Sequence, residues 1–563
     1  MSRRKIFTPF LVLVATGFAA NGLLLFTDHS IWDGLLYLHS YGWTGGREAM
    51  WQLFNEAGRP LDHLGYLLAF ETGQPVFFAK AAGIVSWTVC GILCRRVLRK
   101  AGSLGTAEST LIAALGVSLP VFDVLGDFSM WMHTTSLVFF WVAAALLVDL
   151  PLRRGPLHAW LRAAALILFF VSFNLNSLLV FFYVLAVSLA VLRWEPCRTA
   201  VQLRAASKLV LRHADFAVLP VFFWILKSLL TPTSGHYADY NKPVFSLQVV
   251  WDSIPAFFKL FLIPEPVFVG VSPWFALAAV LAAVLAAAVL GSRRAVRASS
   301  SGGRLLLAGT FLLAGAVAPY FLVGQFPASH GWWARNAILT GLPLGMGLVG
   351  FSILATRLLQ NRFTAAWTIL PLALLVLGVV ASNRAILRLQ GLGAKHEAVR
   401  LALQREIADA DPLLVQLRDY FPLPETVDSY PPVIWSSLAA REGLAPRTIV
   451  FDTIPLAPHQ ETVDEKGRLL INMPFLPMDD AAVNQLAEST TVPQLFKEMP
   501  REGPQILVVL REGSLGNNGV QLGWRHLFFK WLEPEKRPDF FRNLVEVVSS
   551  PLPPVRKSSV QTP

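Results

Sequence analysis

The sequence predicts an all-α polytopic membrane bundle, followed by a C-terminal α/β domain outside the cytoplasm. Hydrophobic residues make up 54% of the 563 residues and charged residues only 15%, a balance typical of integral membrane proteins. Apolar runs recur at close to the ~20 residues that a helix needs to cross a bilayer. After about residue 390 the composition becomes mixed, and short runs such as "TIVFD" and "QILVVLRE" predict buried strands.

The apolar runs give about eleven spans, although closely paired boundaries near Asn174 and Asp123 allow about ten to twelve. The first run follows "MSRRK" and is too long for the core of a signal peptide, which favours a retained anchor. The predicted spans are residues 6–26, 76–98, 107–125, 130–149, 157–174, 176–193, 209–230, 273–291, 304–324, 336–357 and 364–383.

Lysine and arginine are concentrated in alternate loops, which predicts a cytoplasmic N-terminus by the positive-inside rule. Loops 27–75, 231–272 and 325–335 then face outward. The net charge of +11 is therefore explained by the basic cytoplasmic loops, and no nucleic-acid partner is expected. Because no outward segment carries an Asn-x-Ser/Thr glycosylation site, we expect a bacterial inner membrane.

The chain is therefore divided into three parts. Residues 1–390 form the membrane domain, residues 391–550 form the extracytoplasmic α/β domain, and residues 551–563 form a disordered tail. Within the first outer loop, Met50, Trp51 and Phe54 have helical spacing, which predicts a helix along the membrane surface.

Four outward aspartates are the first candidate site residues. Asp28 and Asp33 follow the first span in "FTDHSIWDG", and Asp123 and Asp127 lie in "PVFDVLGDFSMWMH". A carboxylate here can take a proton from a hydroxyl, or share a divalent metal with a second acid. Each acid alone is also compatible with an ordinary structural role, such as capping a helix.

Four basic or titratable side chains are candidates for binding a phosphate group. They are Lys227, Arg335, His330 and Arg59. A phosphate at the membrane surface needs fixed donors of this kind, and arginine binds it in a bidentate manner. The alternative is that these side chains reach toward lipid head groups.

The stretch "PTSGHYADYNKP" offers a polar, ring-bearing surface that suits a sugar. Its candidate residues are Tyr237, Tyr240 and Asn241, and the alternative is an ordinary turn. The sequence has no P-loop, glycine-rich dinucleotide turn, HExxH or GxSxG motif, which argues against the enzyme classes that use them.

Together these features resemble the GT-C superfamily of membrane glycosyltransferases over about 390 residues of the chain. In that family a long first outer loop carries an acid near its start, and later cations hold a lipid-linked phosphate. Asp28 or Asp33 matches the first acid, and Asp123 or Asp127 matches the second. "AGRPLDHLGYLL", "SGHYADYN" and "HGWWARN" are similar to outer-loop elements of bacterial members.

The resemblance implies transfer of a sugar from a polyprenyl-phosphate carrier to an acceptor hydroxyl, with inversion at the anomeric carbon. The acceptor is a glycan, a lipid or a protein. Whether the reaction uses a divalent metal, Mg²⁺ or Mn²⁺, is left open. Two alternatives remain: a transporter or flippase of lipid-linked saccharides that breaks no bond, and a scaffold that acts through its outer domain.

Overall fold

The computed structural model describes most of the membrane part and a smaller share of the C-terminal part. It divides into two compact units: Met1–Gly34 with Gly45–Leu389, and Leu35–Thr44 with Gln390–Pro563. The described residues are 4–27, 29–30, 34, 37–38, 41, 46–119, 123–150, 156–193, 213–238, 242, 248, 251, 255, 302–325, 332–358, 364–407, 414–419, 449–452, 461–463, 469–471, 505–510 and 519–550.

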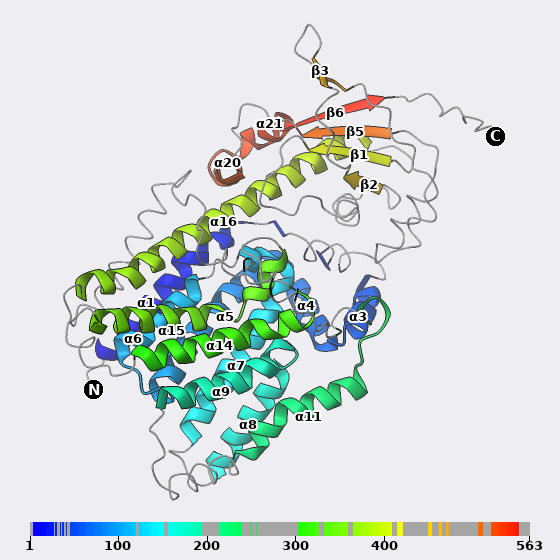
Figure 1. Cartoon of the computed structure of the whole chain (residues 1–563). Coiled ribbons are helices and arrows are strands. Elements are labelled where there is room, and N and C mark those ends of the chain that lie inside the picture. The colour runs from blue at the N-terminus through cyan, green and yellow to red at the C-terminus, as the bar shows by residue number, and fades with distance from the viewer. Residues whose placement is uncertain are drawn as a thin grey trace, which may run out of the picture. The chain divides into compact units, whose positions relative to one another are not determined.

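The described part of the first unit is helical (Figure 1). Its α-helices are α1 (Arg4–Asn21), α3 (Gly46–Glu56), α4 (Pro60–Glu71), α5 (Pro75–Lys100), α6 (Thr106–Ser118), α7 (Trp131–Asp149), α8 (Pro156–Ser172), α9 (Ser177–Arg193), α11 (Ala214–Leu230), α14 (Gly302–Leu322), α15 (Gly341–Leu358) and the part of α16 (Thr364–Ile407) up to Leu389. Its 3₁₀ turns are η1 (Gly22–Phe26), η2 (Asp123–Gly126), η3 (Phe128–Met130), η5 (Gly235–Tyr237) and η7 (Trp332–Ala337).

Six helical segments in the described residues are long and apolar enough to cross a membrane, so the chain is a helical membrane protein. They are Pro9–Phe26, Pro75–Lys100, Phe128–Asp149, Gly302–Leu322, Gly341–Leu358 and Leu370–Ala402. The predicted spans 157–174 and 176–193 form the shorter apolar helices α8 and α9, and 209–230 forms α11. The predicted span 273–291 lies outside the described residues.

The third predicted span, 107–125, forms a shorter helix than expected. Helix α6 has 13 residues and ends at Ser118. Leu119 is extended, with φ −133° and ψ 145°, because the proline that follows it disfavours a helical conformation. The chain then passes into the turns η2 and η3, which hold the predicted acids Asp123 and Asp127.

Glycines let helix α15 approach its neighbours at backbone distance. A Cβ atom on Gly345 would lie 2.5 Å from the Ile112 carbonyl oxygen of α6. A Cβ atom on Gly350 would lie 2.5 Å from the Leu306 nitrogen of α14. Close packing of this kind stabilises helix pairs in a membrane, where apolar burial alone gives little advantage.

The surface helix predicted in the first outer loop corresponds to α3. Met50 and Phe54 are buried on one face, and Phe54 stacks on Tyr66 of α4 at 5.2 Å. The Tyr66 hydroxyl donates a hydrogen bond to the Ser129 carbonyl at 2.5 Å. Trp51 is exposed. This loop is therefore packed onto the start of α7.

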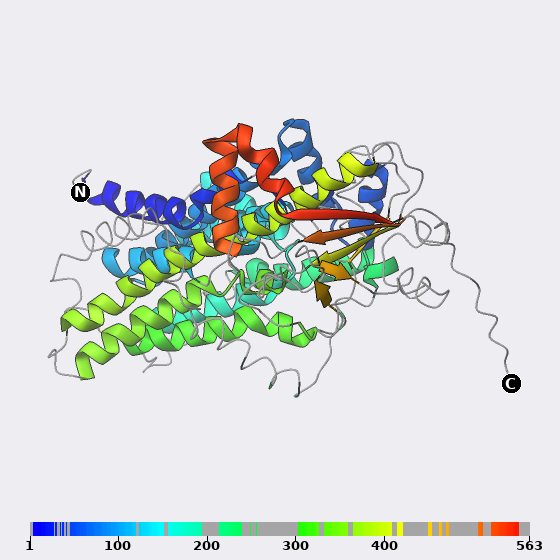
Figure 2. The ribbon, with the colours of Figure 1, turned by 90° about the horizontal axis from the view of Figure 1, so that it is seen from above.

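The second unit contains a four-stranded mixed sheet with strand order β2-β1-β5-β6. β1 pairs in parallel with β2 and β5, and β6 is antiparallel to β5. Figure 2 shows these strands fanning out, as in a twisted sheet. The strands are β1 (Leu414–Asp419), β2 (Ile449–Asp452), β3 (Glu461–Val463), β4 (Leu469–Ile471), β5 (Gln505–Leu510) and β6 (Val545–Ser550).

Strands β2 and β5 lie within the segments "TIVFD" and "QILVVLRE", and β3 pairs with β4 in a separate two-stranded sheet. Helix α20 (Gly519–Trp531), the turn η8 (Pro534–Lys536) and helix α21 (Arg537–Arg542) precede β6.

The close packing of α15 against α14 can be tested with two matched glycine variants. We expect Gly350→Ala to lower the unfolding free energy in detergent by about 1–3 kcal/mol, because the added methyl meets backbone atoms that cannot move aside. Gly347→Ala in the same helix meets nothing within 4 Å and should stabilise the protein slightly. Thermal unfolding of both variants measures the difference, and equal midpoints would contradict this account.

Candidate functional site

A cavity of about 480 Å³ lies where several segment ends of the first unit meet. Its walls come from the α3–α4 turn, the α8–α9 turn, the end of α11, the end of α14 and the turn η7. Its volume is in the range of small-molecule binding sites.

The structure brings four predicted site residues to this one cavity. Arg59, Lys227 and Arg335, predicted to bind phosphate, line it together with Tyr237, predicted to bind a sugar. These residues are far apart in the sequence, so their grouping is a property of the fold.

Five other predicted residues lie outside the described part of the chain. They are Asp28, Asp33, His330, Tyr240 and Asn241. Asp123 lies in η2, but its side chain is not among those described. The roles assigned to these residues stay predictions.

Asp127 lies at the contact between the first outer loop and the turn η3. Its carboxylate accepts a hydrogen bond from the Ser129 amide at 2.7 Å and caps that turn. The Phe128 amide donates to the Ser30 hydroxyl at 2.9 Å. A Cβ atom on Gly34 would lie 2.7 Å from Asp127 Oδ2, so the residue that follows Asp33 in sequence is held against this carboxylate.

A glycine turn places Arg59 at the cavity. The Arg59 amide donates to the Phe54 carbonyl at 2.8 Å, and the Gly58 amide donates to the Asn55 carbonyl at 2.9 Å. These two bonds form a Schellman motif that ends α3, with Gly58 at φ +65° as its left-handed residue. Pro60 then starts α4, so the direction of the chain on both sides of Arg59 is fixed.

A buried acid that the sequence reasoning missed, Asp62, lies behind Arg59. The Asn174 side-chain amide donates to Asp62 Oδ1 at 2.6 Å, and Arg59 Nε is 3.8 Å from Asp62 Oδ2. Burial raises the pKa of the Asp62 carboxyl, and the nearby positive charges of Arg59 and Lys227 lower it in part. Its sequence signal is an acid two residues after Pro60 in "GRPLDH".

The short turn "FNLNS", residues 173–177, supplies polar side chains to several cavity walls. Besides the Asn174 bond to Asp62, Asn176 Oδ1 accepts a hydrogen bond from Lys227 Nζ at 2.9 Å. The Tyr320 hydroxyl donates to the Ser177 hydroxyl at 3.3 Å. The sequence shows this polar interruption between two apolar runs, but it predicts only an uncertain boundary between two spans there.

The remaining walls are also fixed by local structure. Helix α14 ends in a second Schellman motif, with Gly324 at φ +70° and the Gln325 amide bonded to the Tyr320 carbonyl at 2.9 Å.

Nη1 of Arg59 lies 3.4 Å from Nε2 of His133, another cavity residue. The Ser234 amide donates to the Glu56 carbonyl at 2.9 Å, which holds the segment that carries Tyr237 beside the end of α3.

A second buried charge that the sequence reasoning missed is Lys80 of α5, inside an apolar run. Its ammonium group donates to the Thr27 carbonyl at 3.2 Å, the Thr27 hydroxyl at 2.6 Å and the His29 carbonyl at 2.5 Å. Lys80 thus holds the two residues that flank Asp28 in the sequence.

The charges at the cavity favour an anionic ligand. Arg59, Lys227 and Arg335 carry three positive charges, and no acid is among the described residues that line the cavity. Asp62, which is bonded to Asn174, is 3.8 Å from Arg59. Cations held in fixed positions at a partly buried site attract and orient anions such as phosphate groups.

An apolar groove adjoins the cavity. The groove has a volume of about 340 Å³ between α9 and α11, and its exposed lining is entirely apolar. Leu179 and Trp224 line both the groove and the cationic cavity. The Tyr183 hydroxyl, which also belongs to the groove, donates to the Ala217 carbonyl at 2.7 Å. The two sites together match a molecule with an anionic head and an apolar tail.

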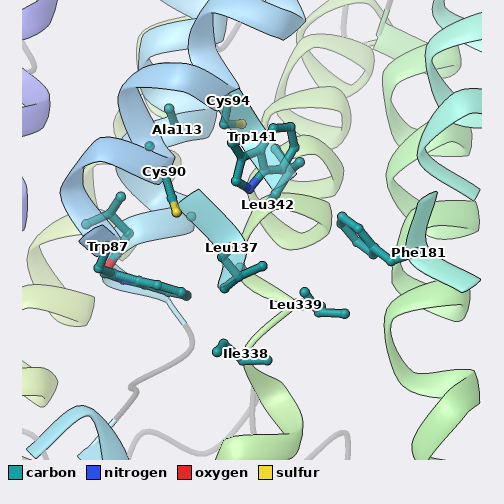
Figure 3. Close-up of a pocket in the computed structure, with 14 residues that line it drawn as sticks. Trp87, Cys90, Cys94, Ala113, Leu137, Trp141, Phe181, Ile338, Leu339 and Leu342 are labelled. Atoms are coloured by element: carbon teal, nitrogen blue, oxygen red, sulfur yellow. The ribbon is translucent and has the colours of Figure 1, made fainter. Parts of the chain in front are cut away.

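A second cavity lies inside the helix bundle (Figure 3) and measures only about 50 Å³. Leu137, Trp141 and Phe181 are among the side chains that line it. The Trp87 indole nitrogen donates to the Val117 carbonyl at 2.9 Å, so it is already bonded. This volume holds a few water molecules at most, and we assign no substrate to it.

The prediction of a divalent metal gains no support from the described side chains. No three of their His, Cys, Asp or Glu residues are grouped closely enough to hold a metal ion. Asp28 and Asp33 are not among the described side chains. The proposed reaction has no step through a metal.

Comparisons with protein-family models, curated proteins and solved structures give no match for this chain.

Asp62 predicts a pH dependence of stability. Because its pKa is raised in the folded protein above the ordinary 3.8, its contribution to stability is fully present below that value and is lost as the pH rises through the raised pKa. We expect Asp62→Asn to reduce the loss of stability on raising the pH, measured as unfolding midpoints over a pH series. Asp539→Asn, which changes an exposed acid, is the control, and parallel profiles for Asp62→Asn and wild type would contradict the prediction.

Proposed function

We propose that the protein is an integral membrane glycosyltransferase that moves a sugar from a polyprenyl-phosphate carrier to an acceptor hydroxyl. The observation that supports this is the joining of a cavity with three cations to an apolar groove. A polyprenyl-phosphate sugar has the matching parts: a polar sugar, a charged phosphate and a long apolar chain.

The proposal includes the topology predicted from the sequence. About eleven spans would cross a bacterial inner membrane, with the N-terminus in the cytoplasm. Residues 391–550 would form an extracytoplasmic α/β domain, and the reaction would take place at the outer face. A donor on a lipid carrier suits that location because the carrier brings the sugar across without a nucleotide.

The donor would bind with its phosphate between Arg59, Lys227 and Arg335. Each has a defined position: Arg59 by the Gly58 turn, Lys227 by its bond to Asn176, and Arg335 by the turn η7. The apolar chain would leave the cavity past Leu179 and Trp224 into the groove. Tyr237, which also lines the cavity, would contact the sugar.

The reaction would be a single displacement at the anomeric carbon. The acceptor oxygen forms a bond to that carbon while the carbon–oxygen bond to the phosphate breaks. The acceptor proton passes to the carboxylate of Asp28 or Asp33, and the electron pair of the broken bond stays on the polyprenyl phosphate. The three cations stabilise the charge that develops on this leaving group. The acceptor would be a glycan, a lipid or a protein.

The base is tested by replacing each acid with its amide. We expect Asp33→Asn or Asp28→Asn to abolish sugar transfer in a single-turnover assay with a panel of polyprenyl-phosphate sugars, while the unfolding midpoint stays that of wild type. Addition of EDTA in parallel measures metal dependence. Full turnover by both variants would exclude these residues as the base.

The cations are tested in the same assay. We expect Lys227→Met to lower the single-turnover rate by about 10²–10³-fold, because one fixed positive charge at the leaving phosphate is lost. Arg335→Gln should lower it in the same direction. Lys536→Gln, which removes an exposed cation paired with Glu533, serves as the control and should keep the wild-type rate.

Transport without chemistry is the outcome that would overturn the proposal. If the folded wild-type protein moves a lipid-linked sugar across vesicles and forms no product with any donor, the same cavity serves a flippase.

A further inference from the structure

Helix α20 of the second unit has an exposed face that is apolar. Its opposite face is buried through Val520 and Leu527. The spacing of the exposed side chains places them on one side of the helix. These side chains, with their exposed fractions, are Trp524 at 38%, Phe528 at 37%, Trp531 at 57% and Leu532 at 70%.

The orientation of α20 is fixed by its packing within the unit. A Cβ atom on Gly391 would lie 2.3 Å from the Gly519 carbonyl oxygen, so α16 and α20 meet at backbone distance. The buried His526 ring is 2.8 Å from the Gln390 side-chain amide and stacks edge-on against Phe541 at 5.3 Å. The exposed apolar face is therefore a stable feature of the unit.

The two charged side chains on α20 are positive, and the first acid after the helix, Glu533, pairs with Lys536 at 2.9 Å. Arg525 and Lys530 lie on α20, and the segment 519–532 contains no acid. The Lys530 ammonium is 5.0 Å from the centre of the Trp531 ring. A helix face directed at water is normally polar, whereas tryptophan and phenylalanine beside cations are typical of helices that lie in a membrane interface.

We propose that α20 is an interfacial anchor that lies on the same bilayer that the spans of this chain cross. Its aromatic residues would enter the boundary between head groups and acyl chains, and Arg525 and Lys530 would contact anionic head groups. This inference concerns a lipid surface, and it is independent of the proposed activity.

The covalent link to the membrane part favours a lipid partner. The main part of the second unit begins at Gln390, inside α16, and the candidate span Leu370–Ala402 belongs to the same helix. The chain therefore keeps α20 at a high effective concentration near the bilayer, so even weak interfacial binding would be populated. A basic aromatic face also complements the negative charge of anionic lipids.

The test uses the full-length protein with Cys90, Cys94 and Cys197 replaced by alanine. A fluorophore is attached at Phe528→Cys, and the protein is reconstituted into phosphatidylcholine–phosphatidylglycerol vesicles that contain a nitroxide lipid labelled near the head group. Arg542→Cys, exposed on α21 of the same unit, carries the fluorophore in the control. We expect the fluorophore at position 528 to be quenched severalfold more than the one at 542.

Two results would overturn the proposal. One is equal lipid quenching at both positions. The other is a fluorophore at position 528 that is shielded both from the nitroxide lipid and from iodide in solution, because protein would then cover the face.

A charge variant tests the head-group contact separately. Arg525→Gln combined with Lys530→Gln should reduce quenching at position 528 in the mixed vesicles and leave it unchanged in pure phosphatidylcholine. An equal reduction in both lipids would overturn the assignment of these cations to anionic head groups.

Discussion

The hydrogen bond from Asn174 to Asp62 joins the parts of the chain that form the cationic cavity. It connects the first turn of α4 to the α8–α9 turn, two segments 112 residues apart. Near Asp62, Arg59 is oriented by the glycine turn that precedes it. Near Asn174, the Asn176 side-chain oxygen accepts a hydrogen bond from Lys227. The bond therefore connects the segment that carries Arg59 to the turn that binds Lys227.

Glycine and proline set the boundaries of the same site. Gly58 and Gly324 each end a helix with a left-handed residue, and Pro60 starts the next helix immediately after Arg59. These residues carry no chemistry of their own. They determine where these helices stop and start, and Arg59 lies in the short turn between two of them.

The sequence predicted the membrane class, the apolar helices and the approximate place where the composition changes, because hydropathy is a local property of the chain. It also selected Arg59, Lys227, Arg335 and Tyr237, since cations and rings at predicted span ends stand out among apolar neighbours. It could not show that they share one cavity, because that depends on contacts between distant segments. Asp62 was missed for the same reason.

Some span boundaries were predicted less well, and the cause is again local. The third span was drawn through the apolar residues that follow Ser118, yet the helix stops there because Leu119 precedes a proline. Hydropathy does not report such a backbone restriction. In α15 the sequence shows several glycines, but only the packed structure distinguishes Gly345 and Gly350, where an added Cβ would meet neighbouring backbone atoms, from Gly347, where it would meet nothing within 4 Å.

The bonds of Lys80 have a consequence for the order in which the protein forms during synthesis. An ammonium group has three protons to donate, and Thr27 and His29 accept in the three bonds described above. The acceptors are made about fifty residues before the donor. Thr27 and His29 can therefore make these bonds only after α5 has been synthesised.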